Sequence, residues 1–303
     1  MFEIATALLI GFIILLLLLF LHARKQNPDY FFLVGKVVLI TGASSGIGRA
    51  CSFKFYRHGC KVVLCSRNKA ELIKVKESLE LQTTALGVKA ITPEVHILDV
   101  SDISHVEKNV QNIIEASGGK IDIVINNAGV SYRGHVTSTQ LEVFQKVMDV
   151  NFLGQVAVTK AVLPYMVKSN GGHIIGIGSV QGKIAVPHRA PYTASKHACQ
   201  AFYDSLRSEV AHNNIHVSVV NPGYVKTNLS HSALTDDGSS YGKLDETTAK
   251  GLHPDVIAKF VVHSVILKKK EIMVAPFHHK LVVWIRLICP NLYFWLMKKR
   301  TNV

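Results

Sequence analysis

The sequence predicts an α/β fold, with one doubly wound parallel sheet of about seven strands and helices on both faces. Short apolar runs rich in Val and Ile alternate with longer segments of helical spacing along the chain. Parallel strands that are buried on both faces need such continuous apolar runs, and each crossover between them needs room for a helix. A glycine-rich turn directly after the first run also favours this fold. The expected strands are 37–40, 61–65, 94–98, 121–125, 172–178, 215–220 and 271–274.

The glycine-rich turn has the context of a phosphate-binding site. It reads Thr41-Gly-Ala-Ser-Ser-Gly-Ile-Gly48, follows a strand-like run and leads into helical spacing over 49–56. Backbone N–H groups at such a helix N-terminus bind anions, and the glycines allow a tight turn and the close approach of a pyrophosphate. Alone, such a run can be no more than a turn. The residues expected to build the site are Thr41, Gly42, Ser44, Ser45, Gly46, Ile47 and Gly48.

A second group of residues is suited to proton transfer. Tyr192 and Lys196 stand four residues apart in Tyr-Thr-Ala-Ser-Lys, and Ser179 lies thirteen residues upstream of Tyr192. Positions i and i+4 share one face of a helix, so the ammonium would stabilise a phenolate on the tyrosine. Such a tyrosine can donate a proton to a carbonyl oxygen or accept one from an alcohol. An unrelated Tyr and Lys on a surface helix is the alternative, and the glycine turn upstream argues against it.

Five motifs stand in order along the chain: Thr41-Gly-x-x-x-Gly-x-Gly48, Asn126-Asn-Ala-Gly129, Asn151, Ser179 with Tyr192-x-x-x-Lys196, and Asn221-Pro-Gly223. Across residues 35–275 these motifs resemble those of the short-chain dehydrogenase/reductase family. The resemblance implies a single Rossmann-like domain over that range. Within the family, Ser131-Tyr-Arg-Gly134 and Asp237-Gly-Ser-x-Tyr-Gly242 resemble the membrane-anchored dehydrogenase/reductase member 7B branch.

The resemblance implies a catalytic tetrad in an enzyme that interconverts C=O and CH–OH groups. Tyr192 would be the general acid/base, and Lys196 would support its ionisation and hold the nicotinamide ribose. Ser179 would hydrogen-bond the substrate oxygen, and Asn151 would fix a water beside Lys196 that relays the proton. The hydride itself would come from the nicotinamide cofactor.

The end of the second strand favours NADP(H) over NAD(H). NAD-selective relatives place a carboxylate there, which accepts hydrogen bonds from the ribose hydroxyls, whereas this chain has Ser66, Arg67 and Asn68 after 61–65. The Arg67 guanidinium suits a 2′-phosphate, and a solvated residue at a helix start is the alternative. The resemblance adds cofactor contacts at Asp99, Val100, Asn126, Asn127, Ala128, Gly129, Pro222, Gly223, Val225 and Thr227.

Residues 1–25 are expected to form a membrane anchor. Residues 4–21 are an uncharged apolar run of 18 residues, which as a helix spans about 27 Å, close to the thickness of a bilayer core. Arg24 and Lys25 follow the run, so the positive-inside rule places the catalytic domain in the cytosol. A cleaved signal peptide, which would make the protein lumenal or secreted, is the alternative. We expect a single-pass protein of the endoplasmic reticulum membrane, with the peroxisomal membrane as an alternative.

The C-terminal segment, 276–303, combines apolar and aromatic residues with Lys280, Arg286 and Lys298-Lys-Arg300. Its charges and Pro290 argue against a second span and favour a segment that lies on a membrane surface or covers the site as a lid. The formal net charge of +13 suits anionic headgroups and a phosphate-bearing cofactor. Nucleic-acid binding is not expected, since the sequence holds no module for it.

The sequence therefore predicts a membrane-anchored, NADPH-dependent carbonyl reductase that acts on a lipid-like ketone or aldehyde. The alternative is a lipid-sensing or scaffolding protein that keeps the fold with little catalysis, against which the complete tetrad argues. Five scattered cysteines predict free thiols and neither a disulfide framework nor a metal cluster. By analogy with the family, a homodimer is expected.

Overall fold

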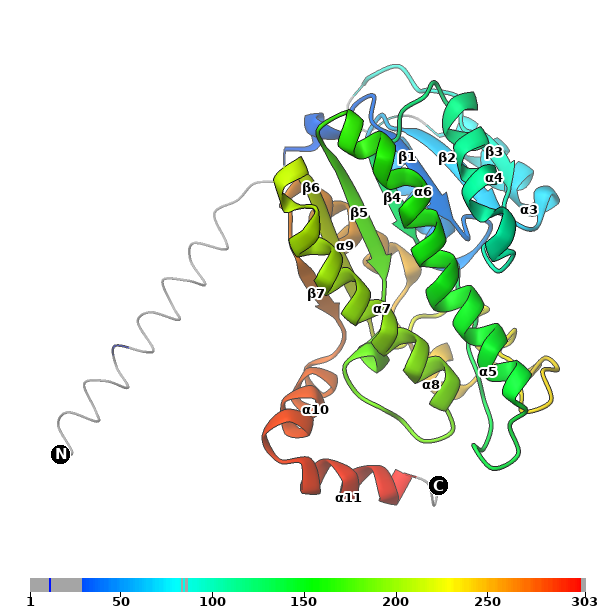
Figure 1. Cartoon of the computed structure of the whole chain (residues 1–303), viewed down its shortest axis with the longest axis vertical. Helices are drawn as coiled ribbons and strands as arrows, with labels where there is room; N and C mark the ends of the chain where they lie inside the picture. The colour runs from blue at the N-terminus through cyan, green and yellow to red at the C-terminus, as the bar shows by residue number, and fades with distance from the viewer. Residues whose placement is uncertain (1–10, 12–28, 83, 85–86, 301–303) are drawn as a thin grey trace.

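The sheet is parallel and has seven strands in the order β3-β2-β1-β4-β5-β6-β7 (Figure 1). The structure, a computed structural model, describes residues 11, 29–82, 84 and 87–300. Each expected strand is present, with bounds that differ from the expected ones by two residues at most, so the predicted fold class is confirmed. The strands are β1 (Val37–Thr41), β2 (Lys61–Ser66), β3 (Glu94–Ile97), β4 (Ile123–Asn126), β5 (Gly172–Ile177), β6 (Ile215–Pro222) and β7 (Glu271–Val274).

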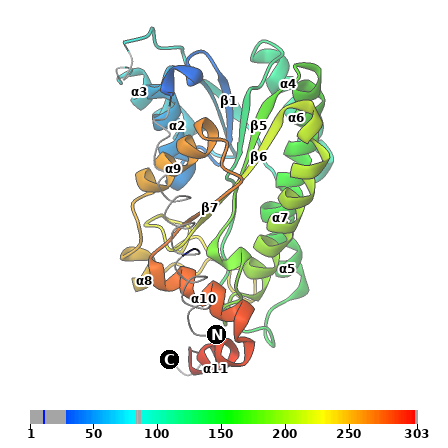
Figure 2. The ribbon, with the colours of Figure 1, turned by 90° about the vertical axis from the view of Figure 1, so that its left-hand side faces the viewer.

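Helices cover both faces of the sheet and enclose a separate apolar core on each. In the view of Figure 2, α2, α3 and α9 lie on one side of the sheet and α4, α6 and α7 on the other. Val38 and Ile40 of β1 pack in the first core and Leu39 packs in the second, which explains why successive positions of this strand are apolar. These helices are α2 (Gly46–Arg57), α3 (Lys69–Glu80), α4 (Ile103–Ala116), α6 (Gly154–Lys168), α7 (Ala190–Glu209) and α9 (Pro254–Ile266).

Among the residues that the structure describes, one helical stretch, Leu141–Lys168, is long and apolar enough to cross a membrane. It joins α5 (Leu141–Met148), the π-helical turn η2 (Asp149–Leu153) and α6. Half of its most apolar window is buried inside the protein, where Val158 and Val162 belong to one of the two cores. Part of this stretch therefore packs in the core. Apart from residue 11, the apolar run 4–21 expected to form the anchor lies outside the described residues.

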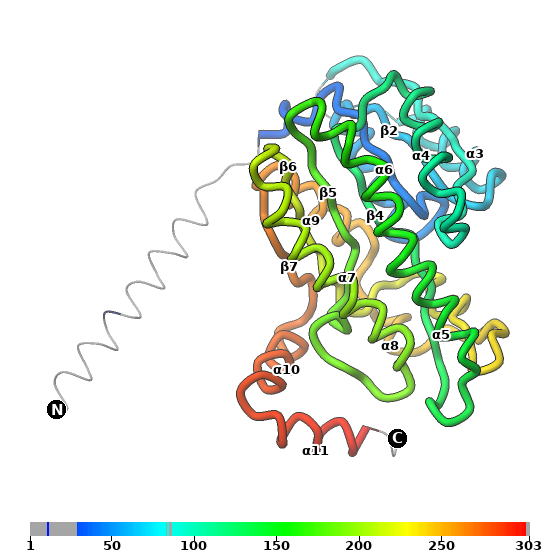
Figure 3. The backbone as a smooth tube through the Cα atoms, viewed as in Figure 1, coloured from blue at the N-terminus to red at the C-terminus, as the bar shows by residue number. Residues whose placement is uncertain are grey.

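The loops and terminal helices that shape the site gather at the carboxyl ends of the strands, as the trace in Figure 3 shows. The chain leaves β7 into α10 and then α11, which begins at Pro290, a residue that is tolerated in the first turn of a helix but not in its interior. The other elements are η1 (Tyr30–Leu33), η3 (Val180–Gly182), η4 (Ala211–Asn213), α8 (Glu246–Ala249), α10 (Phe277–Ile288) and α11 (Pro290–Arg300).

The five cysteines are all free thiols, and only Cys289 is exposed. Burial raises the pKa of the other four thiols, and in the case of Cys65 raises it to about 12. These four side chains therefore stay protonated at neutral pH and behave as small apolar residues of the core.

Candidate active site

A cavity of about 530 Å³ lies at the carboxyl ends of the strands, which is where open α/β sheets bind their ligands. It connects the glycine-rich turn after β1 with Tyr192 and Lys196 on α7. Of the residues expected from the sequence, those that line it are Gly42, Ser44, Ser45, Gly46, Ile47, Ser66, Arg67, Asn68, Asp99, Val100, Asn127, Ala128, Gly129, Ser179, Tyr192, Lys196, Pro222, Gly223, Val225 and Thr227. The cavity lining does not include Thr41, Gly48, Asn126 and Asn151.

The glycine-rich turn has a backbone that side chains would disturb. Gly42 and Gly46 have φ angles of +65° and +53°, in the left-handed region that favours glycine. A Cβ atom at Gly48 would collide with the Gly42 carbonyl oxygen and with the Asn127 amide. Helix α2 begins here with no acidic residue in its first turn, so its N–H groups and its dipole can accept an anion. This cradle fits the phosphates of a dinucleotide.

Thr41 and Asn126 stabilise the glycine-rich turn and the neighbouring loop through hydrogen bonds inside the protein. The Thr41 hydroxyl accepts hydrogen bonds from the backbone N–H groups of Asn127 at 3.0 Å and Ala128 at 3.1 Å. The buried Asn126 amide donates to the hydroxyls of Thr159 and Tyr203. Sequence reasoning expected both residues to touch the cofactor. The structure places both outside the cavity lining, where they fix the ends of β1 and β4, and cofactor contact by either residue stays a prediction.

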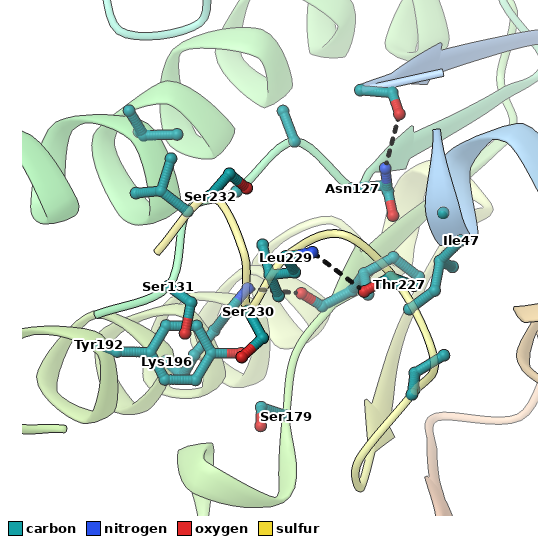
Figure 4. Close-up of a pocket in the computed structure, with 18 of the residues that line it drawn as sticks. Ile47, Asn127, Ser131, Ser179, Tyr192, Lys196, Thr227, Leu229, Ser230 and Ser232 are labelled. Carbon is teal, nitrogen blue, oxygen red and sulfur yellow. Dashed lines mark hydrogen bonds between the residues drawn. The ribbon is translucent and has the colours of Figure 1, made fainter. Parts of the chain in front are cut away.

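Tyr192, Lys196 and Ser179 share one wall of the cavity (Figure 4). The Lys196 Nζ lies 5.8 Å from the centroid of the Tyr192 ring and donates a hydrogen bond to the Ile177 carbonyl at 2.9 Å. The Ser179 hydroxyl accepts a hydrogen bond from the Gln181 N–H at 3.1 Å, and its own O–H remains able to donate. All three residues are at most 8% exposed. An ammonium, a phenol and an alcohol are thus held together beside the space that leads to the glycine turn.

Asn151 is fully buried in the π-helical turn η2, a type of irregularity that often marks functional sites. Its amide group bonds both the N–H and the C=O of Val130, at 2.7 and 2.9 Å. It also donates to the Ser195 hydroxyl at 3.0 Å, and its backbone carbonyl accepts a hydrogen bond from the Cys199 thiol. Asn151 therefore ties the loop after β4 to α7.

The far end of the cavity lies at the carboxyl ends of β2 and β3. Arg67 is exposed and lines the cavity, while the amide oxygen of Asn68 caps α3 by accepting from the Glu71 N–H at 3.1 Å. Asp99 accepts hydrogen bonds from the backbone and side chain of Ser101, which fix its position. The guanidinium of Arg67 is thus a cation at the position where a dinucleotide's adenosine ribose is expected.

The loop after β6 covers the glycine turn. The methyl group of Thr227 lies 3.1 Å from the position that a Cβ atom at Gly46 would take. Pro222 and Gly223 lie at the end of β6, and Val225 forms a bridge with Leu252. The cavity therefore has a roof made by a segment that is distant in sequence from the cradle.

The family model described as short chain dehydrogenase matches residues 36–238. The chain belongs to the short-chain dehydrogenase/reductase family. A relative from Drosophila melanogaster, dehydrogenase/reductase SDR family protein 7-like, is 51% identical over 91% of this chain and 82% of its own length. The dehydrogenase/reductase SDR family member 7B of Xenopus laevis is 45% identical over 89% of this chain and 84% of its own length. The resemblance to this branch is confirmed.

Solved structures of other short-chain dehydrogenases share this fold. An alcohol dehydrogenase from Thermococcus sibiricus, complexed with 5-hydroxy-NADP, has a TM-score of 0.66 and 29% identity, and covers 79% of this chain and 95% of that one. A short-chain dehydrogenase/reductase from Burkholderia phymatum, in complex with NAD, has a TM-score of 0.73 and 25% identity over 86% of this chain and 95% of that one. The family and these neighbours support an oxidoreductase with an NAD(P)-binding fold.

One polar cluster in this short-chain dehydrogenase was not predicted from the sequence. Arg133 donates to Asp245 through Nε at 2.8 Å and through Nη2, and Arg189 donates to the same carboxylate at 3.3 Å. Arg133 also bonds the hydroxyls of Ser131 and Ser230, which both line the cavity. The cluster joins three loops around the substrate end of the cavity. Only the branch-specific segment 131–134 hinted at it, because no spacing links the three charged residues.

The charged groups of this cluster shift the pKa values of their neighbours. Burial alone would raise the pKa of Asp245, but hydrogen bonds from Arg133 and Ser230 and the charges of both arginines hold that pKa below its ordinary value. Burial and the nearby charge of Arg133 lower the pKa of Arg189 to about 10, against the opposing effect of Asp245. Asp245 and Arg189 therefore stay charged at neutral pH.

The C-terminal helices contribute two further lining residues. His279 of α10 packs on Gly223, whose Cβ position would lie 3.1 Å from its Nδ1 atom, and Arg300 of α11 donates to the Tyr224 hydroxyl at 2.9 Å. Burial, together with the charges of His278 and Arg300, lowers the pKa of His279, so its ring is neutral at pH 7. Sequence reasoning placed this segment near the site but could not name the residues that reach it.

Proposed function

We propose that this protein is a membrane-anchored, NADPH-dependent carbonyl reductase that acts on a hydrophobic, lipid-like ketone or aldehyde. The observation that carries the proposal is the single cavity that joins the glycine-rich cradle to Tyr192, Lys196 and Ser179. The family membership also supports it.

When bound, the reduced cofactor would supply the hydride. Tyr192 would donate its phenolic proton to the substrate oxygen, so that the carbonyl gains one hydride and one proton and becomes an alcohol. The Ser179 O–H would hold the same oxygen and stabilise the negative charge that develops on it. Lys196 would stabilise the phenolate left on Tyr192 and bind the nicotinamide ribose. Asn151 would position a water near Lys196 for reprotonation.

Arg67 supports NADP(H) as the cofactor. In the segment Ser66–Asn68 no carboxylate is present to repel a 2′-phosphate, and the guanidinium can bind phosphate oxygens through two parallel hydrogen bonds. The solved neighbours include one complex with an NADP derivative and one with NAD, so the family alone does not decide the cofactor.

The proposed anchor is the N-terminal run 4–21, in the endoplasmic reticulum membrane, with the catalytic domain on the cytosolic side. An apolar substrate that partitions into a bilayer fits such an anchor, because the enzyme and its substrate then share one surface. By analogy with the family, the protein would form a homodimer.

The test is the Tyr192→Phe variant of the full chain, assayed with NADPH against a panel of lipid ketones and aldehydes. Loss of the acid/base group should lower kcat by a factor of about 100 or more, while NADPH binding measured by fluorescence stays unchanged. Tyr165→Phe is the matched control, since Tyr165 lies on α6 and is not among the residues that line the cavity. Equal turnover by Tyr192→Phe and wild type would refute the assigned chemistry.

A further inference from the structure

The C-terminal hairpin, α10 and α11 together (Phe277–Arg300), exposes many large apolar side chains. On α10, Phe277, Leu281, Trp284 and Ile288 recur at spacings of four, three and four, which places them along one side of the helix. Figure 2 shows the hairpin at the end of the molecule, beyond the carboxyl ends of the strands. The large apolar residues of the hairpin that are 46–78% exposed are Phe277, Leu281, Trp284, Leu287, Ile288, Leu292, Phe294 and Trp295.

This outer face is too large to be ordinary apolar surface. Phe277, Trp284, Phe294 and Trp295 are 52–78% exposed, which at roughly 200 Å² for each aromatic side chain leaves about 500 Å² of ring surface in solvent. Soluble monomers rarely expose more than a few hundred Å² of contiguous apolar surface without a partner. Together with the exposed aliphatic side chains of the hairpin, this area favours an occupant for the face.

The charges of the hairpin identify the chemistry of that occupant. Residues 275–303 contain five Lys or Arg residues and no Asp or Glu. The Arg286 guanidinium lies 5.4 Å from the Tyr293 ring and 5.1 Å from the Phe294 ring, and the Lys299 ammonium lies 3.7 Å from the Trp295 ring. Of these rings, Phe294 and Trp295 are exposed, so cations are mixed with exposed aromatic rings, which is the composition of segments that lie in a membrane interface.

The two tryptophans of the chain, Trp284 and Trp295, both lie exposed on this hairpin. Tryptophan has an apolar ring and a polar N–H, and it concentrates at the level of lipid headgroups. A second copy of the chain would bring the same cations face to face, which costs free energy, whereas anionic lipids would neutralise them.

The opposite side of the hairpin is fixed to the active site. Tyr293 is 1% exposed, packs with Val180 and Ile184, and donates a hydrogen bond to the Ala185 carbonyl. His279 and Arg300 line the cavity itself. A single layer of helix therefore separates the exposed apolar face from the substrate space.

We propose that the outer face of the C-terminal hairpin docks on an anionic bilayer surface, and that an apolar substrate passes from the bilayer into the cavity beside this hairpin. The docking does not depend on the proposed reductase activity, whereas the access route rests on it. The hairpin would contact the membrane with its outer face and line the cavity with its inner side. It would therefore connect the membrane to the active site.

The tryptophans give a direct test in the unmodified full-length chain, because all of its tryptophan emission comes from this hairpin. The protein is reconstituted in vesicles of phosphatidylcholine and phosphatidylserine, with and without bromine on the upper acyl chain. Insertion to the headgroup–acyl boundary should quench about half of the emission in brominated vesicles. Replacing phosphatidylserine by phosphatidylcholine, or adding salt, should reduce the quenching.

A matched pair of variants separates the hairpin from the N-terminal run. Leu287→Glu places a carboxylate on the docking face, at a side chain that is 74% exposed, and should abolish most of the quenching. Leu81→Glu makes the same change at a side chain that is 85% exposed after α3 and should leave the quenching unchanged. Unquenched emission in every brominated vesicle overturns the docking. A dimer that persists in detergent and shields the tryptophans from aqueous iodide would show that a second copy of the chain covers the face instead.

The access route is tested by kinetics with the same two variants. Leu287→Glu should raise KM about tenfold for a ketone dissolved in the vesicles and leave the KM for a water-soluble carbonyl compound unchanged. Equal KM values for the bilayer ketone in Leu287→Glu and wild type overturn the access route. If the wild type reduces no carbonyl compound while its tryptophans are quenched, the proposed function fails and the docking stands.

Discussion

Replacing Asp245 by asparagine tests whether the cluster with Arg133 and Arg189 holds the substrate end of the cavity together. The substitution keeps the size of the side chain but removes the charge that both guanidinium groups contact. The two arginines then face each other without an opposing carboxylate. Because Asp245 immediately precedes α8 in the long loop after β6, the loss of its contacts should loosen that loop before it affects the sheet.

The expected cost follows from the burial of the three side chains. Removing one partner of a fully buried ion pair costs about 3–5 kcal/mol. Here the side chains of Arg133, Arg189 and Asp245 retain 11%, 14% and 17% exposure, and asparagine can still accept a hydrogen bond. We therefore expect a loss of about 2–3 kcal/mol in the free energy of unfolding, or a Tm lower by about 5 °C for a domain of this size.

The assay is thermal denaturation together with limited proteolysis of the loop 228–252, in wild type and Asp245→Asn. Glu246→Gln is the control, since the neighbouring Glu246–Lys250 pair is exposed and such pairs contribute at most about 1 kcal/mol. Equal Tm values and equal cleavage of the loop in Asp245→Asn and wild type would refute the reasoning.

The same variant has a defined pH dependence. The pKa of Asp245 is held below its ordinary value of 3.8 in the folded protein, so its contribution to stability is fully present above that value and is lost as the pH falls through the lower, folded-state pKa. The difference in Tm between wild type and Asp245→Asn should therefore be constant between about pH 5 and pH 7 and shrink below about pH 4. A difference that grows on acidification would contradict this assignment.

Three other substitutions test the cofactor end and the core. Arg67→Glu should weaken NADPH binding by a factor of about 10–100 and favour NADH, since a carboxylate repels the 2′-phosphate. The ratio of the KM for NADPH to the KM for NADH measures this change in preference, and an unchanged ratio would contradict the role of Arg67. Gly48→Ala should weaken NADPH binding at least about tenfold in a fluorescence titration, because the added Cβ would push the turn away from Asn127. Wild-type affinity in this variant would show that the turn accommodates the Cβ without loss of binding. Tyr203→Phe removes the hydroxyl that bonds Asn126 and Gln155 and should cost about 1–3 kcal/mol in chemical denaturation, a cost that an unchanged midpoint would exclude.

The strands were predictable because a parallel sheet covered on both faces leaves a strong pattern in the sequence. Strands such as β2 and β6 are buried at nearly every position, and so they read as unbroken apolar runs. Most candidate site residues were predictable for a related reason. They follow the carboxyl ends of those strands, and the topology brings such positions to one edge of the sheet.

Orientation and loop contacts were not predictable in the same way. Thr41 and Asn126 belong to the right motifs but point into the protein, because a motif gives the position of a residue and not the direction of its side chain. Arg133, Arg189 and Asp245 come from three separate loops whose meeting depends on the whole fold. The reach of Arg300 to Tyr224 depends on how the two last helices turn, which no local pattern encodes.

Cys289 lies at the joint between α10 and α11 and is the one exposed thiol among the five cysteines. The other four are enclosed in the core and hold their protons firmly, so a thiol-directed label should react at this joint alone. The natural chain thus offers a single attachment point for a spectroscopic reporter, placed where the hairpin bends, and its movement could be followed without altering any residue.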